Sequence, residues 1–185
     1  MNRLLNVYEK FHSSSLRKKA IDFCLEYINA EDEQTNYIDI GPVNQVMNSI
    51  AAYHAYGKDL EQFKKHVERW ADYLWVAEDG MKMQGYNGSQ LWDTAFAVQA
   101  ITEGGFEKYF PETVEKAFEF IDASQIKEEV RDHKKYFRHD SLGGWPFSTA
   151  EHSWPITDCT AEGLKVSLRN KEIGKSGNQE IRKSA

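Results

Sequence analysis

Residues 93–105 read D-T-A-F-A-V-Q-A-I-T-E-G-G, and this stretch carries a complete helix signal. Asp93 is a residue type that caps helix N-termini, and the pair Gly104-Gly105 is typical of a helix end. Between them the apolar residues recur at helical spacing and do not alternate as they would in a strand. The stretch therefore predicts a helix over Thr94–Thr102.

Similar signals recur on both sides of this stretch. Pro42 predicts another helix start, because proline suits the first helical position, and Asp158 is placed to cap a last helix. Alternation of the kind typical of strands is absent, so the sequence predicts an all-α fold. The apolar stripes at helical spacing lie on residues 15–29, 42–50, 60–74 and 111–121, and the second of these consists of Val43, Val46, Met47 and Ile50.

Composition limits the classes of protein that this chain can represent. Its 185 residues suit one domain, and 41% hydrophobic with 28% charged residues exclude wholesale disorder and a collagen-like repeat. No apolar run is long enough to cross a bilayer, and no secretory signal follows Met1. The net charge of −6 argues against a nucleic-acid partner, which needs a basic surface.

The potential metal ligands do not have the spacing of a known metal-binding motif. The two cysteines, Cys24 and Cys159, lie far apart, and the six histidines form no H-E-x-x-H motif, so we expect no metal site. Residues 169–185 contain no aromatic residue and carry five basic against two acidic side chains. This composition predicts a disordered tail after the folded region 1–168.

One carboxylate stands beside a thiol in the segment W-P-I-T-D-C-T-A-E at residues 154–162. The simplest interpretation of Asp158 is a helix cap. The functional interpretation is a general acid, because aromatic surroundings favour the protonated form of a carboxyl group, and Cys159 can tune it by hydrogen bonding. The two roles are compatible.

A second segment brings aromatic residues to a helix entrance. Residues 79–93 contain three glycines and a polar run, but they lack the spacing of a phosphate-binding loop. Trp92 near the end of this segment is either a core residue or part of a ligand-binding surface. Residues 78–92 and 140–157 each lead to an aspartate, and D-T-A at 93–95 echoes D-C-T-A at 158–161. Helical hairpins joined by such loops favour a repeated unit.

These segments resemble the oxidosqualene cyclases. The run D-C-T-A-E at 158–162 is similar to a motif of that family, as is M-K-M-Q-G-Y-N-G-S-Q-L-W-D-T-A-F at 81–96. Y-I-D-I-G-P at 37–42 and Y-L-W at 73–75 agree as well. Ser124-Gln125 and Gly144-Trp145 resemble the two halves of one of the family's Q-W repeats, split by an insertion. The resemblance extends from about residue 3 to residue 168.

The resemblance implies a fold and an activity. Members of the family are α/α toroids built of helical hairpins, and they cyclise 2,3-oxidosqualene to sterols or triterpenes without a metal or organic cofactor. They lie on the endoplasmic reticulum membrane or on lipid droplets, although no anchor is evident here. By position, Asp158 matches the proton donor, Cys159 matches a residue that hydrogen-bonds it, and Trp92 and Phe147 match aromatics that line the cavity.

Three further positions bear on the product. Tyr86, His152 and Ile156 resemble the combination found in family members that form cycloartenol, whereas those that form lanosterol more often carry Thr and Val at the first and third positions. A Tyr–His pair can place the base for the closing proton loss, and Ile156 adds bulk that holds the cation in register.

Other interpretations stay open. Known members are several times longer, so the chain resembles an internal fragment of the toroid, and a truncated or non-catalytic product is one alternative. A lanosterol or other triterpene synthase fragment is another. A sugar-processing α/α toroid is a distant third, in which Asp158 and Glu162 would be the paired carboxylates.

Overall fold

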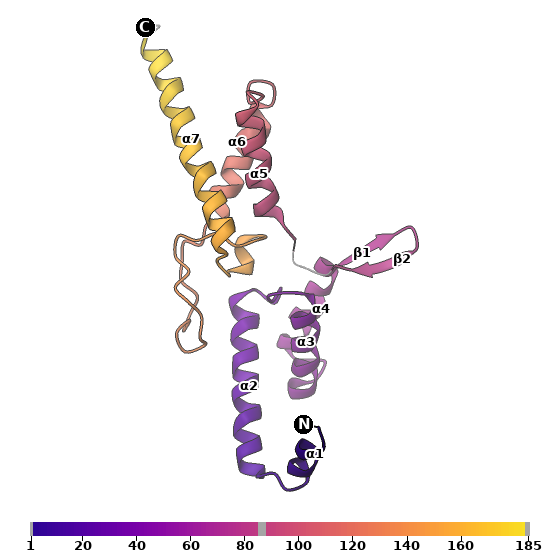
Figure 1. Cartoon of the computed structure of the whole chain (residues 1–185). Helices are drawn as coiled ribbons and strands as arrows, with labels where there is room; N and C mark the ends of the chain where they lie inside the picture. Colours follow the sequence, from indigo (N-terminus) through magenta and orange to yellow (C-terminus); the bar gives the residue numbers. More distant parts are fainter. Residues whose placement is uncertain (1, 85–87, 184–185) are drawn as a thin grey trace.

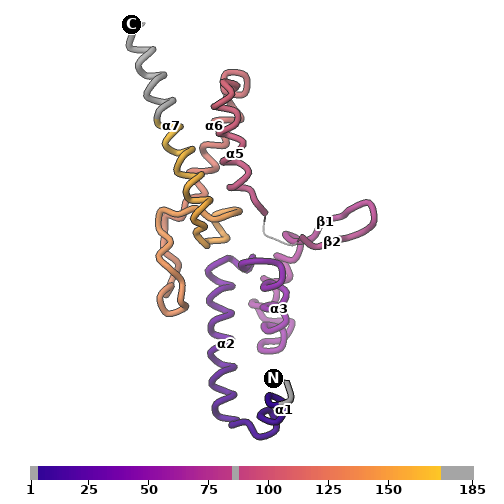
Figure 2. Tube along the Cα trace, viewed as in Figure 1, coloured from indigo at the N-terminus to yellow at the C-terminus, as the bar shows by residue number. Residues whose placement is uncertain are grey.

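The computed structural model describes residues 2–84 and 88–183, with side chains described over residues 4–84 and 88–171 (Figure 2). The elements along the chain are α1 (Asn2–Lys10), α2 (Ser14–Gln34), α3 (Pro42–Tyr56), α4 (Glu61–Arg69), the 3₁₀ turn η1 (Trp70–Tyr73), β1 (Leu74–Ala77), β2 (Gly80–Met83), α5 (Gln90–Glu103), α6 (Pro111–Ser124), the 3₁₀ turn η2 (Ala150–His152) and α7 (Thr157–Lys183).

The helices form two groups that follow each other along the sequence (Figure 1). In the first group α3 packs against both α2 and α4, and in the second α5, α6 and α7 pack against one another. The β1–β2 hairpin projects from the side of the molecule where the first group gives way to the second (Figure 1). The mostly helical class that the sequence predicts is confirmed, with hairpins of packed helices as its unit.

The two strands are a departure from the sequence prediction. The apolar stripe of residues 60–74 predicts a continuous helix, but α4 ends at Arg69 and the chain becomes extended at Leu74. The strands pair antiparallel with Leu74 opposite Met83 and Ala77 opposite Gly80. The physical reason lies in the turn: Asp79-Gly80 is a hairpin signal, and Gly80 has a φ of +123° that glycine adopts without strain.

The apolar core lies between α5, α6 and α7. Ridges from all three helices meet there, so that each helix buries one stripe and exposes the opposite side. α6 begins at Pro111, as its sequence predicts. The buried members of this core are Leu91, Ala95, Val98, Val114, Phe118, Ile121, Trp145, Cys159 and Val166.

α5 begins at Gln90, four residues before the start that its sequence predicts. The N–H groups of a first helical turn need acceptors outside the helix. Here the backbone of Leu91 donates to the carbonyl of Ser148 at 3.0 Å, and that of Trp92 donates to Phe147 at 3.4 Å. A distant segment therefore serves as the cap, and Asp93 lies within the first turn, as Asp158 does in α7.

α3 places its polar face inward. Gln45, Asn48 and Ser49 are buried, whereas Val43 and Met47 of the predicted apolar stripe are 72% and 62% exposed. Gln45 donates to the carbonyl of His66 at 3.0 Å, which ties α3 to α4. The stripe is thus helical as predicted, but within this chain hydrogen bonding rather than apolar contact decides which face packs.

The split Q-W halves meet in space. Gln125 follows α6 and donates through Nε2 to the carbonyl of Gly143 at 3.0 Å, and the amide of Ile126 donates to Gly144 at 2.9 Å. The indole N–H of Trp145 then donates to the carbonyl of Ile121 at 2.8 Å. The end of α6 is therefore held by both halves of the motif, although residues 126–143 separate them in sequence.

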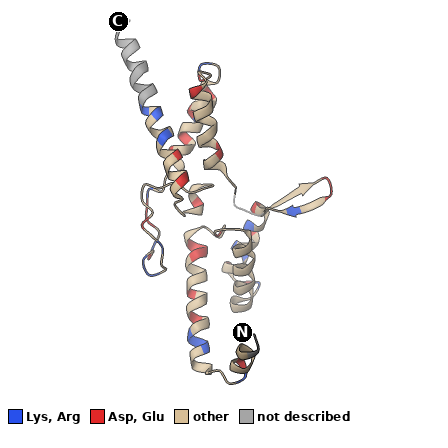
Figure 3. Cartoon of the chain, in the orientation of Figure 1, with Lys and Arg blue, Asp and Glu red and all other residues tan. Residues whose placement is uncertain are grey.

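α7 carries acidic residues in its first turns and basic residues further along its described part, an order that suits the helix dipole (Figure 3). The helix continues to Lys183, whereas composition predicts a disordered tail at residues 169–185. Residues 169–171 are exposed, and the side chains of residues 172–185 lie outside the described ones, so disorder of this tail in solution stays a prediction. Within the described residues, no helix is both long and apolar enough to cross a membrane.

Candidate functional site

An extended segment at residues 145–148 aligns the first turns of α5 and α7. It accepts the two α5 hydrogen bonds described above, and the carbonyl of Trp145 also accepts from the amide of Ile156 at 2.9 Å. In return the amide of Trp145 donates to Thr160 Oγ1 at 2.9 Å, within the first turn of α7. Two helix starts and one connecting segment therefore meet at a single place, and five of the predicted site residues belong to them.

Aromatic and aliphatic side chains gather at this junction. Trp92 makes an edge-to-face contact with Phe96 at 4.7 Å between ring centroids and lies 6.0 Å from Phe147. Trp92, Phe147 and Ile156 are partly buried, and each packs against the α5–α6–α7 core. They form the boundary of that core, where one side of a ring is packed and the other stays accessible. The structure thus brings three of the predicted cavity residues together.

Asp158 and Cys159 lie in opposite environments. Asp158 is exposed in the first turn of α7, whereas Cys159 is only 1% exposed and belongs to the core. Burial and the neighbouring Asp158 charge raise the pKa of the Cys159 thiol to about 11, so it keeps its proton at neutral pH. A protonated thiol is a weak hydrogen-bond donor. The expected aromatic enclosure of the Asp158 carboxyl group does not exist within the described residues, where that side chain is open.

His152 is the most enclosed of the predicted site residues apart from Cys159. It ends the η2 turn and is 4% exposed. Burial lowers the pKa of His152 to about 4, a hydrogen bond with the backbone of Ile40 opposes this, and the charge of Arg138 makes the smallest contribution, which also lowers the pKa. The imidazole is therefore neutral at physiological pH. Tyr86, the third residue of the predicted product-determining set, lies outside the described residues.

Glu162 is occupied by other partners. Its carboxylate accepts from Gln99 Nε2 at 2.8 Å and from Lys165 Nζ at 2.7 Å, and the hydrogen bond from Lys165 holds the pKa of Glu162 below its usual range. A carboxylate held ionised in this way, on the same helix as Asp158, is poorly suited to the paired acid and base of a glycosidase, which flank the substrate.

The sequence analysis did not identify a buried polar cluster in the first helical group. His66 Nε2 lies 3.1 Å from Asp32 Oδ2, and His66 Nδ1 lies 3.9 Å from Asp39 Oδ2, with all three side chains almost fully buried. Asn48 donates to Asp32 at 3.0 Å. The three residues come from α2, the α2–α3 connection and α4, so no sequence spacing reveals them. The sequence feature that could have indicated this cluster is the set of polar residues at helical spacing on α3.

This cluster holds ligand types that a metal ion could use. Potential ligand atoms of Asp32, Asp39 and His66 lie within 4.8 Å of one another, as do those of Glu129, His133 and Asp140 in the long 125–144 segment. In the first group the Asp32 oxygens already accept from His66 and Asn48. Because protein donors occupy these acceptors, we assign the cluster a structural role in joining α2 to α3 and α4.

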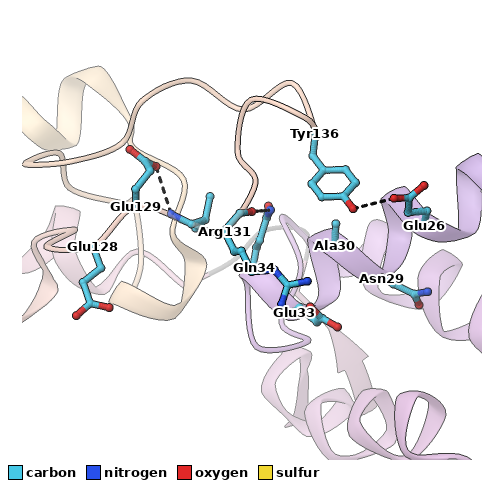
Figure 4. Close-up of a pocket in the computed structure, with 10 residues that line it drawn as sticks. Glu26, Asn29, Ala30, Glu33, Gln34, Glu128, Glu129, Arg131 and Tyr136 are labelled. Atoms are coloured by element: carbon cyan, nitrogen blue, oxygen red, sulfur yellow. Dashed lines mark hydrogen bonds between the residues drawn. The ribbon is translucent and has the colours of Figure 1, made fainter.

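The 125–144 segment lies against α2 and encloses a groove of about 520 Å³ with it (Figure 4). Gln34 donates to the carbonyl of Arg131 at 2.9 Å, and the Tyr136 hydroxyl donates to Glu26 at 3.1 Å. Arg138 also contacts Gln34, at 3.1 Å from Nη1 to Oε1. The sequence analysis singled out none of these residues, although they connect α2 with the 125–144 segment.

Comparison with known proteins gives the chain its family. No family model matches it. It is 55% identical over 168 residues to a cycloartenol synthase of Dictyostelium discoideum, which covers 91% of this chain and 24% of the relative. It is 48% identical over 167 residues to a lanosterol synthase of Mus musculus, with 89% and 23% covered. It is 41% identical over 154 residues to the α-onocerin synthase LCD of Lycopodium clavatum, with 83% and 20% covered.

The resemblance that the motifs indicated is thus confirmed over about nine-tenths of the sequence. Relatives named as cycloartenol and as lanosterol synthases both match, and they match the same length of chain to within a few residues. The chain spans about a quarter of the length of these curated relatives. It therefore corresponds to a segment of an oxidosqualene cyclase.

Proposed function

We propose that this chain supplies the acid end of a cyclisation site, with Asp158 as the proton donor and 2,3-oxidosqualene as the substrate. The observation that supports this most directly is the junction of the α5 and α7 first turns. The exposed carboxyl group of Asp158 and the buried, protonated thiol of Cys159 lie there in the first turn of α7, and Trp92, Phe147 and Ile156 pack against the core to which the thiol belongs. The position of Asp158 in the matching D-C-T-A-E motif supports the same role.

The chemistry follows from these residue types. Protonated Asp158 transfers its proton to the epoxide oxygen, and a carbon–oxygen bond of the epoxide breaks as the electron pair of the nearest alkene forms a new carbon–carbon bond. Asp158 is left as a carboxylate, which the Cys159 thiol stabilises by a hydrogen bond. The migrating cation then needs negative electrostatic potential from uncharged groups, because a full anion would capture or deprotonate it. The faces of Trp92 and Phe147 provide such potential.

The product that we propose is cycloartenol. Its cyclopropane forms when a base removes a methyl proton from the final cation. His152 is neutral and hence able to accept that proton, and Ile156 restricts the position of the substrate. Since relatives of both names match the chain, a lanosterol-type product is the alternative, and Tyr86 and Ile156 are the positions that bear on the choice.

The reaction requires no metal or organic cofactor in this proposal, because protonation and rearrangement involve no redox step. The substrate is a long apolar molecule that resides in lipid. We therefore propose that the complete enzyme works at the surface of the endoplasmic reticulum membrane or of lipid droplets, in agreement with the family resemblance.

A segment exchange tests the proposal. The matching segment of the Dictyostelium discoideum cycloartenol synthase is replaced by this chain, and the purified chimaera is assayed with 2,3-oxidosqualene by gas chromatography. We expect cyclised product from the chimaera and a loss of about a thousandfold or more with Asp158→Asn, because an amide cannot supply the proton.

Glu162→Gln is the matched control. It removes a second carboxylate from the same helix, and turnover should stay close to that of the unmodified chimaera. Retention of turnover by Asp158→Asn at the level of the control would contradict the assignment.

A further inference from the structure

Arg138 joins three parts of the molecule that are distant in sequence. Its Nη2 donates to the carbonyl of Ser153 at 2.6 Å and approaches Ser153 Oγ at 3.2 Å, while Nη1 donates to Gln34 Oε1 at 3.1 Å. Its guanidinium lies over the ring of Trp154 at 3.9 Å from Cζ to the centroid. Arg138 thus fixes the turn that follows His152 onto the C-terminal end of α2.

The turn itself is conformationally demanding. Ser153 has a φ of +54°, in the left-handed region that non-glycine residues rarely adopt. Its hydroxyl donates to the carbonyl of Gln34 at 2.8 Å, and its carbonyl receives the short bond from Arg138. Surrounding contacts have to hold such a residue in place. The guanidinium supplies two of them.

The charge of Arg138 has no close anionic partner. The side chain is 5% exposed, and among the described residues no carboxylate lies within 4.0 Å of its nitrogen atoms. Glu129 and Glu31 act on it only from a greater distance. A buried cation without a direct anion is costly for the fold.

His152 directly precedes the turn that Arg138 holds, and its imidazole is buried. Burial is the largest cause of its lowered pKa, a hydrogen bond with the backbone of Ile40 acts in the opposite direction, and the charge of Arg138 contributes least. Contacts that keep water from the ring therefore keep the imidazole neutral. Arg138 supplies such contacts to the adjacent turn, through Ser153 and Trp154.

We propose that Arg138 is a positioning residue of the cyclisation site, which holds the turn at residues 152–154 against α2 and so keeps the imidazole of His152 buried at its place in that site. This rests on the function proposed above. A neutral imidazole is useful there for two reasons: it accepts a proton from a strongly acidic carbocation, and it adds no positive charge that would repel that cation. The contribution of Arg138 is separate from the proton donor, because it acts through His152.

The titration of His152 tests this proposal without an assay of turnover. The full 185-residue chain is labelled with ¹⁵N-histidine, and the imidazole signals are followed from pH 4 to pH 9, with His152 assigned by His152→Gln. We expect the wild-type ring to stay neutral above pH 6. In Arg138→Gln the turn should loosen and water should reach the ring, so the pKa of His152 should rise by roughly one unit or more, which is a tenfold larger protonated fraction at pH 6.

Two variants separate the charge from the shape of the side chain. Arg138→Lys keeps the cation and loses the planar fork, so the amides of residues 152–154 should exchange faster with solvent and the pKa of His152 should rise as in Arg138→Gln. Arg131→Gln is the matched control, because Arg131 lies in the same segment but its side chain is 86% exposed, and it should change neither readout.

The outcomes that would overturn the proposal are specific. One is a folded wild-type chain whose His152 titrates near pH 6.5. The others are an Arg138→Gln variant with unchanged titration and exchange, and a shift of equal size in the Arg131 control. None of them depends on Asp158, so the cyclase proposal and the role of Arg138 can fail independently.

Discussion

At the scale of single residues, two aspartates face one histidine inside the first helical group. Burial and the charge of Asp32 raise the pKa of Asp39 to about 8, against a usual value of 3.8. Asp39 is fully buried, and its Oδ2 faces His66 Nδ1 at 3.9 Å. The fold therefore retains a proton on Asp39 that the unfolded chain would release in neutral solution.

This arrangement predicts a pH-dependent stability. Between pH of about 4 and about 8 the folded chain binds a proton that the unfolded chain lacks, so the free energy of unfolding should fall as the pH rises through that window. In Asp39→Asn the side chain at position 39 cannot ionise. The free energy of unfolding should therefore lose this pH dependence, which amounts to a change on the order of a few kcal/mol across the window. Urea unfolding followed by circular dichroism at pH 5 and pH 8.5 measures it.

Asp59→Asn, at an exposed position, is the control for that experiment and should leave the pH dependence as in the wild type. An Asp39→Asn variant that loses stability with rising pH as steeply as the wild type would refute the role of Asp39.

Ile156 gives a second prediction at the residue scale. In the chimaera described above, Ile156→Val should leave total turnover largely intact and add lanosterol-type products. One methylene is worth about 1–3 kcal/mol in an apolar pocket, which is a roughly tenfold change in partitioning. Gas chromatography of the product mixture measures the ratio. Ile101→Val is the matched control, since Ile101 also packs partly buried against the same core but on α5.

A chimaera that makes only lanosterol before any substitution would show that the cycloartenol proposal is wrong, while the cyclase proposal would stand. An equal change of product in the Ile101 control would mean that general loosening of the core, and not Ile156, alters the outcome.

At the scale of elements, α7 and the segment at residues 145–148 approach each other so closely that no side chain fits at Gly163. A Cβ on Gly163 would lie 2.8 Å from Cδ2 and 3.0 Å from Cγ of the Trp145 ring. That ring cannot move freely, because its N–H is bonded to the carbonyl of Ile121 at the end of α6. The missing side chain of Gly163 therefore sets the distance at which α7 approaches Trp145, and with it the position of Asp158.

Gly163→Ala should accordingly destabilise the chain, although alanine is the better helix former. The steric cost of about 1–3 kcal/mol exceeds the gain in helix propensity of about 1 kcal/mol. Thermal or urea unfolding measures the difference from wild type. In a Trp145→Leu background, where the indole is absent, the same substitution should become neutral or stabilising. If it costs as much there, contact with the ring is not the cause.

At the scale of the whole molecule, large apolar side chains remain open on the first helical group. On α2, Leu16 and Phe23 are 58% and 50% exposed, and on α3 the stripe with Val43 and Met47 is exposed as well. Apolar surface of this extent on a soluble chain favours association. Asp158 is exposed as well, whereas an acid that protonates a carbocation precursor needs an enclosed environment. The site is therefore as incomplete within this chain as the packing of the first helical group.

We therefore predict that the isolated 185-residue chain keeps its helices, self-associates and forms no cyclised product. Sedimentation velocity, binding of the dye ANS and incubation with 2,3-oxidosqualene measure these properties. Val43→Gln combined with Met47→Gln should lower ANS binding, whereas Asn44→Gln on the same helix should not. A monomer that binds no ANS, or any cyclised product from the chain alone, would contradict the prediction.

Much of this protein is determined by local sequence. Pro42, Pro111 and the glycine pair after α5 mark helix ends by backbone geometry alone, and apolar spacing marks the helices between them. The motifs also lead to Trp92, Phe147, His152, Ile156, Asp158 and Cys159, all of which lie at or beside the starts of α5 and α7 or in the segment between them. These site residues follow from the family resemblance of the motifs, and their roles stay a prediction.

Only the tertiary structure decides the remainder, because it depends on partners far apart in the chain. The start of α5 at Gln90 follows from acceptors in residues 147–148, and the inward polar face of α3 follows from His66 and Asp32. The two halves of the Q-W motif meet only when residues 126–142 fold back on α2. The same fold places the charge of Arg138 beside His152. Sequence spacing cannot predict such pairs, since hydrogen bonding and burial act through space and the chain connects these groups only by long loops.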